Sequence, residues 1–266
     1  MSLHAAWRYL LFGLLVGGSA FASAADRAHW QSVDYLVDAF VEIALRSEYS
    51  PKPSTVRKWI TPVNYFIVHQ VADEDLHQRL IRTHFEQLAE ITGLTIRPAE
   101  SQAAANYLIV MTSEDLLKED MQTYLGWRST ARREKFFRES VCLSTFSIKP
   151  KGPIFRAVVI IPVDRARARR KLVACVVEEL TQVMGLANDS VKVFPSVFND
   201  LSTDVFLSGL DSLLLKMLYD PRVKAGMDED AVRPILQQIA TEFERDDRFA
   251  TAEKAAAEGG LSALSP

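Results

Sequence analysis

Hydrophobic residues recur at helical spacing in several stretches of the chain. In the first stretch Leu36, Phe40 and Ile43 fall on one stripe, and such a stripe predicts an amphipathic helix with one buried face. Asp73 and Gly93 bound the second stretch as an N-cap and a C-cap. We therefore predict helices over 32–46, 73–92, 167–184, 207–219 and 228–244, with a shorter helix over 114–125.

Runs of apolar and β-branched residues separate these helical stretches and predict strands. The strongest run is A-N-Y-L-I-V-M-T at 105–112, and the turn K-P-K-G-P at 149–153 divides the last two runs. Strands in the first half followed by helices are typical of an α+β domain. We predict strands over 59–68, 94–97, 105–112, 141–148 and 155–162, and a charged, exposed connector over 128–138.

The N-terminus has the three parts of an export signal. Arg8 supplies a positive charge, residues 10–16 form a short apolar core, and Ala22-Ser23-Ala24 is a small-residue cleavage site. The apolar core is shorter than the ~20 residues that a membrane span needs, and an uncleaved anchor is the alternative. We predict a signal peptide at 1–24, a periplasmic or secreted protein, and no membrane span after cleavage.

The remaining chain divides into three predicted parts. Residues 25–58 are expected to hold an N-terminal helix and a linker, and 59–246 the main domain. The last part, 247–266, is rich in alanine, glycine and serine and is expected to be a disordered tail.

Charge and cysteine content narrow the classes of partner and compartment. The net charge is −3, and without a basic stripe interleaved with aromatic residues we exclude nucleic acid as a partner. A basic run at 165–171 opens a predicted helix, where cations oppose the helix dipole. This run is either a solvated first turn or a surface for an anionic partner.

Cys142 and Cys175 predict one disulfide in an oxidising compartment, the alternative being two buried free thiols.

The segment 178–189, E-E-L-T-Q-V-M-G-L-A-N-D, has the spacing of a zinc-protease helix, H-E-x-x-H-x-x-G-x-x-H-D, without its histidines. Glu178, Gln182 and Asn188 occupy the three positions of the metal-binding imidazoles. Glu179, the position of the general base, and Asp189 remain. Carboxylate and amide oxygens hold zinc poorly. They suit a hard cation such as Ca²⁺ better, but too few of them are present for a calcium site. We therefore predict no metal and no cofactor. The alternative is a solvated helix face with a capping glycine.

The motif and its surroundings resemble the bacterial exported family catalogued as domain of unknown function 2927. The resemblance covers about residues 59–227 and rests on C-x-x-E-E-L-T-Q at 175–182, G-L-A-N-D at 185–189, S-V-F-N-D at 196–200 and L-Y-D-P-R-V-K-A-G-M at 218–227. More distantly, these segments resemble a metzincin or zincin-like metallopeptidase that has lost its zinc ligands. That resemblance implies a mixed twisted sheet, a backing helix, a motif helix and a helical C-terminal half, with Phe198 in place of a methionine under the metal.

Other catalytic constellations are weaker. His77 and His84 lie two turns apart on a predicted helix, a separation too long for shared zinc, so we interpret them as structural or solvent-facing. Glu179 with Asp189 or Asp200 forms an acid/base pair only if the fold brings them together.

Three functions are compatible with these patterns. The first is a non-catalytic, metallopeptidase-like binding protein that holds a peptide, a cell-envelope fragment or a protein partner through Glu178, Gln182, Asn188 and Asp189. The alternative is a hydrolase with an unusual site that uses Glu179 as general base. The third is a structural accessory of the cell envelope that docks a partner through the basic run or the C-terminal helices.

Overall fold

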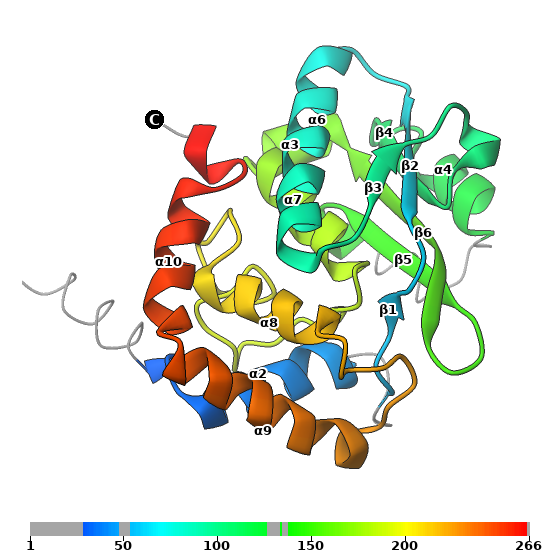
Figure 1. The fold of residues 1–266 in the computed structure, drawn as a ribbon. Coiled ribbons are helices and arrows are strands. Elements are labelled where there is room, and N and C mark those ends of the chain that lie inside the picture. The colour runs from blue at the N-terminus through cyan, green and yellow to red at the C-terminus, as the bar shows by residue number, and fades with distance from the viewer. Residues whose placement is uncertain (1–28, 48–53, 127–133, 135–137, 265–266) are drawn as a thin grey trace, which may run out of the picture.

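The computed structural model describes residues 29–47, 54–126, 134 and 138–264. A six-stranded sheet forms one half of the molecule and a group of helices forms the other (Figure 1). This arrangement confirms the predicted α+β class. The predicted signal peptide, 1–24, and most of the predicted connector, 128–138, lie outside the described residues.

The sheet is mostly parallel. Its strands are β1 (Lys58–Trp59), β2 (Val63–His69), β3 (Ile96–Pro98), β4 (Tyr107–Thr112), β5 (Leu143–Ile148) and β6 (Pro153–Pro162). Their order is β1-β6-β4-β2-β3, and β5 pairs antiparallel with β6. All six residues of β4 are buried, because this central strand is covered on both faces.

The predicted strand 59–68 is divided in two. β1 pairs with β6, whereas β2 pairs with β4 and β3. Pro62 lies between them, and since proline has no N–H to donate, the ladder is interrupted there.

Two layers of apolar side chains cover the faces of the sheet. On one face α3 (Glu74–Thr92) and α7 (Leu172–Gln182) pack over Tyr107, Ile109 and Val159. On the other face α4 (Leu117–Leu125) covers Leu108 and Val158. Successive residues of β4 therefore enter different cores, as the two-residue period of a strand requires.

The predicted motif helix, 167–184, is broken into α6 (Val163–Ala168) and α7. Arg170 adopts a left-handed conformation with φ 57°, and the Lys171 N–H donates to the Ala166 carbonyl at 2.7 Å. This bond closes α6 in the manner of a Schellman motif, whose left-handed position is usually glycine. Because an arginine occupies that position, the sequence carries no helix-stop signal.

The helical half contains α2 (Val33–Leu45), α8 (Gly209–Tyr219), α9 (Glu229–Arg245) and α10 (Arg248–Glu258), with a short 3-10 turn, Ser262–Leu264. In this half α2 packs against α9, and α8 packs against α10 (Figure 1). The side chains of α2 enter the same core as those of the sheet and α8, so the N-terminal helix is continuous with the main domain.

The prediction of a disordered tail is wrong for 248–258. Helix α10 buries Phe249, Ala252 and Ala256, and its backbone at Glu253 comes so close to Gly209 that a Cβ there would lie 2.8 Å from the Glu253 nitrogen. The contact therefore depends on the glycine at 209 in α8, and two of the alanines that indicate disorder by composition are buried in α10. Within the described chain, no helix has both the length and the apolar character to cross a membrane.

Candidate functional site

The disulfide between Cys142 and Cys175 positions the motif helix. The predicted bond is present, with the two Cα atoms 6.0 Å apart. Cys142 directly precedes β5, and Cys175 lies near the start of α7. The bond therefore holds α7 beside the antiparallel strand at this edge of the sheet.

Gln182 links the edge strand, the motif helix and the loop that follows it. The Ser144 hydroxyl on β5 lies 3.3 Å from Gln182 Oε1, and Gln182 Nε2 donates to Asp189 Oδ1 at 2.7 Å. The edge strand, which is 38 residues away in the sequence, and the loop that directly follows α7 thus meet at one amide. Sequence analysis predicted Gln182 and Asp189 as site residues but missed Ser144, because a serine in a strand carries no signal of its own.

Glu179 lies beneath this link. Its side chain is 6% exposed. Burial raises the pKa of Glu179 to about 8, a hydrogen bond with Ser144 opposes the rise, and the charge of Asp189 adds to it. The carboxyl group is therefore mainly protonated at neutral pH, and it serves there as a hydrogen-bond donor as well as an acceptor.

Glu178 adds a second carboxyl group whose pKa is raised. Burial raises its pKa well above the ordinary range, and Glu179, Asp189 and Asp200 raise it further in that order, while Lys171 opposes them. Glu178 is partly exposed, unlike Glu179. Glu178 is therefore the solvent-facing member of the two neighbours.

Asn188 does not join this cluster. Its side chain is 4% exposed, and Nδ2 donates to the Glu42 carbonyl at 2.9 Å, while its backbone N–H donates to the Ile43 carbonyl at 3.1 Å. It therefore satisfies carbonyl groups in the last turn of α2. Among the described residues no group of three or more His, Cys, Asp or Glu side chains is arranged to hold a metal ion.

The glycine of the motif has a packing role. Gly185 has φ 119°, and a Cβ there would collide with the Arg57 carbonyl oxygen. The segment that precedes β1 passes directly against this turn. A side chain at 185 is excluded both by the backbone conformation and by the lack of space.

Aromatic side chains satisfy the carbonyl groups at the end of α7. Trp59 Nε1 donates to the Val183 carbonyl at 2.9 Å, the Tyr219 hydroxyl to Met184 at 2.8 Å, and the Tyr107 hydroxyl to Leu180 at 3.1 Å. These bonds replace the intrahelical partners that a helix C-terminus lacks. They join residues that are distant in sequence, so sequence analysis missed them.

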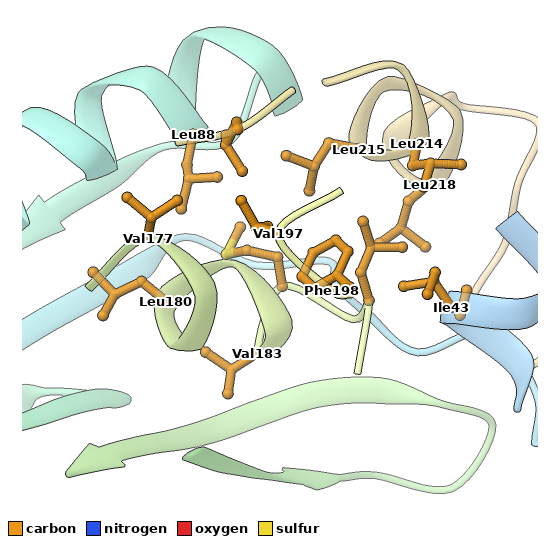
Figure 2. Packing of buried hydrophobic residues seen from close by; sticks show 14 of the residues in the cluster. Ile43, Leu88, Val177, Leu180, Val183, Val197, Phe198, Leu214, Leu215 and Leu218 are labelled. Carbon is orange, nitrogen blue, oxygen red and sulfur yellow. The ribbon is translucent and has the colours of Figure 1, made fainter. Parts of the chain in front are cut away.

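Phe198 is a core residue. It is fully buried, and Figure 2 shows its ring among side chains of α7, α8 and α2. The adjacent turn is held by Asp211, which accepts hydrogen bonds from the Ser196 hydroxyl at 2.6 Å and the Val197 N–H at 3.1 Å. Burial raises the pKa of Asp211 to about 6 in spite of these bonds.

The histidines of α3 are buried. His84 Nε2 lies 2.9 Å from the Thr181 hydroxyl, and burial lowers the pKa of His84 to about 4. His77 stacks on His69 with ring centroids 6.0 Å apart. Both contacts join α3 to neighbouring elements, in agreement with a structural role.

The fold and the site define an α+β domain in which a helix with two adjacent carboxyl groups of raised pKa lies beside the antiparallel strand of a mostly parallel sheet. The chain belongs to the family described as "Protein of unknown function (DUF2927)", which matches residues 33–238, from the start of α2 into α9. This match confirms the family that the motif segments indicate. No curated protein and no solved structure matches the chain.

Proposed function

We propose that this protein is an exported binding protein without catalytic activity, and that it holds an extended peptide or peptide-like envelope fragment along the free edge of β5. The observation that carries the proposal is the position of β5. Within the described residues this strand pairs with β6 alone, and it lies directly beside the polar residues of α7 through the Ser144–Gln182 contact.

An unpaired strand edge is a general site for peptide recognition. Its outward N–H and C=O groups bind an added strand, and neighbouring side chains select the sequence. Ser147 and Ile148 at the end of β5 are exposed, whereas Leu143 at its start is buried. A ligand strand would therefore extend from the α7 site toward the exposed end of β5.

The charges beside β5 favour a cationic ligand. Glu178 lies in the field of Asp189 and Asp200, and Lys171 is the cation that opposes them. A ligand amine or guanidinium beside Glu178 would lower its pKa, because an opposite charge stabilises the carboxylate. Binding would then release protons, and affinity would increase as pH rises through the neutral range.

The finer resemblance to a metallopeptidase-like domain is part of this proposal. Its support is the combination of a mixed sheet, an antiparallel edge strand, α3 as a backing helix, α7 beside the edge, and a helical C-terminal half. A peptidase-like scaffold of this kind binds substrate along its edge strand by backbone pairing, and this surface does not require the metal.

The geometry favours binding over hydrolysis. A general base needs contact with the water that it activates, and Glu179 is buried beneath β5. Asn188, the third ligand position of the motif, contacts α2 instead. Export is supported by the N-terminal signal pattern and by the disulfide, which is typical of oxidising compartments.

The test is a binding experiment on the oxidised protein with peptides of matched length and different charge. We expect cationic extended peptides to bind and to slow backbone hydrogen exchange at 143–148. Glu178→Lys should weaken binding about tenfold or more, whereas Glu90→Lys, a control on the exposed side of α3, should not. Peptide cleavage that is abolished by Glu179→Gln would favour the alternative function, a hydrolase with Glu179 as general base. Peptide binding without slower hydrogen exchange in β5 would contradict the proposed binding site.

A further inference from the structure

A hollow of about 480 Å³ opens where α6 ends and α7 begins. The loop that leads to α8 forms its opposite wall. None of its lining residues belongs to β5 or to the Glu178–Glu179 pair, so this surface is separate from the site described above. The lining residues are Arg167, Arg170, Leu172, Val173, Val205 and Phe206.

The apolar part of the hollow is partly open to solvent. Leu172, Val173 and Phe206 are half-buried and pack against the main core. Val205 is 36% exposed on the opposite wall. The four side chains therefore form an apolar surface that is anchored in the core and remains partly exposed to solvent. Small-molecule sites are lined by apolar surfaces of this kind.

The polar part of the hollow is cationic. Arg167 forms an ion pair with Asp73 at 2.8 Å, but Arg170 forms none among the described residues. Arg169 and Lys171 flank Arg170 in the sequence. Cations at the start of α7 oppose the dipole of that helix, whereas at the end of α6 they complement it. Helix stability therefore accounts for positive charge here only in part, and Arg170 also occupies a left-handed position that favours glycine. An anionic ligand gives a further reason for an arginine at 170.

We infer that this hollow binds a single-chain anionic amphiphile, that is, a carboxylate head group joined to an aliphatic chain. The guanidinium groups of Arg167 and Arg170 match a carboxylate in charge and hydrogen-bonding geometry. The aliphatic chain covers the Leu172, Val173 and Val205 side chains. An inorganic anion would contact only the arginine side chains, and a neutral apolar molecule would contact only the apolar side chains.

Calorimetric titration of the oxidised full chain with laurate, below the concentration at which it forms micelles, tests this inference. We expect saturable binding with one site per molecule. Acetate, a neutral dodecyl glycoside and dodecyltrimethylammonium should bind at least about tenfold more weakly. Absence of saturable laurate binding, or equal binding of the neutral or cationic detergent, would overturn the inference.

Variants locate the site. Arg170→Gln removes the cation and Val205→Asp places a carboxylate on an exposed part of the apolar wall, and each should weaken laurate binding about tenfold. Arg245→Gln removes an exposed arginine at the end of α9 and should leave binding unchanged. Wild-type affinity in both Arg170→Gln and Val205→Asp would assign the binding to another surface and would contradict the inference. Peptide binding at β5 should be unaffected in all three variants, so this experiment is independent of the proposed function.

Discussion

The Ser144 hydroxyl on β5 lies 3.3 Å from the side-chain oxygen of Gln182 on α7. Through its nitrogen, the same amide also donates to Asp189. The edge strand, the motif helix and the following loop therefore share one polar junction, with Glu179 buried beneath it. A glutamine side chain can form both contacts because its amide oxygen accepts from Ser144 while its amide nitrogen donates to Asp189.

Gln182→Ala should lower the free energy of unfolding by about 1 kcal/mol, because two hydrogen bonds at a half-buried site are lost. Urea denaturation of wild type and variant measures the difference. Gln237→Ala is the control, since Gln237 is exposed and donates a single bond of 3.2 Å to Asp34. An equal effect of the two substitutions would mean that the junction adds no stability.

Glu179 should make the free energy of unfolding depend on pH. Burial raises its pKa in the folded protein from 4.5 to about 8, so the folded state binds the proton more tightly than the unfolded state does. Its contribution is complete below pH 4.5 and is lost as pH rises toward 8. Glu179→Gln cannot ionise, so its stability relative to wild type should increase steadily between pH 5 and pH 8.

Thermal or urea unfolding across this pH range measures the effect. Glu90→Gln on the surface of α3 is the control and should parallel the wild type. A constant difference between Glu179→Gln and wild type at every pH would show that Glu179 ionises normally in the folded protein.

Removal of the disulfide should lower the free energy of unfolding. It closes a segment with a sequence separation of 33, and the chain-entropy relation gives about 3 to 4 kcal/mol for a loop of this length. We expect the double variant Cys142→Ser, Cys175→Ser to unfold at correspondingly lower urea concentration, and the reduced wild type to behave like it. An unchanged midpoint in the double variant would contradict this expectation.

Gly185→Ala should destabilise the protein more than Gly126→Ala. Both glycines have positive φ, but a Cβ at 185 collides with the Arg57 carbonyl whereas a Cβ at 126 meets no atom within 4 Å. Gly126→Ala should therefore cost about 1 kcal/mol through backbone conformation alone. Gly185→Ala should cost at least about 1 to 3 kcal/mol more. Chemical denaturation distinguishes the two, and equal losses would mean that the Arg57 segment moves freely.

Local patterns predicted much of this fold. Hydrophobic periodicity located α2, α3, α8 and α9 to within a few residues, because each buries one regular stripe. The pair Cys142–Cys175 and the family were also accessible from the sequence. The break between α6 and α7 was not accessible from the sequence. The left-handed residue that ends α6 is usually glycine, and here it is Arg170.

The geometry of the candidate site could be predicted only in part. Helical spacing brought Glu178, Glu179 and Gln182 to one region, since residues three and four apart share a face. It could not reveal that Asn188 turns toward α2, nor that Trp59 and Tyr219 contact the end of α7. Those contacts depend on tertiary packing between distant segments.

Trp30, near the start of the described chain, packs edge-on against Phe249 of α10, with ring centroids 6.0 Å apart. Helix α2 also packs on α9, so both ends of the described chain are anchored in the helical half (Figure 1). Attachment to a sensor chip through the C-terminal end would hold the molecule by its helical half, while β5 belongs to the other half, which the sheet forms (Figure 1). Immobilised protein is thus a suitable format for capturing ligands from a mixture.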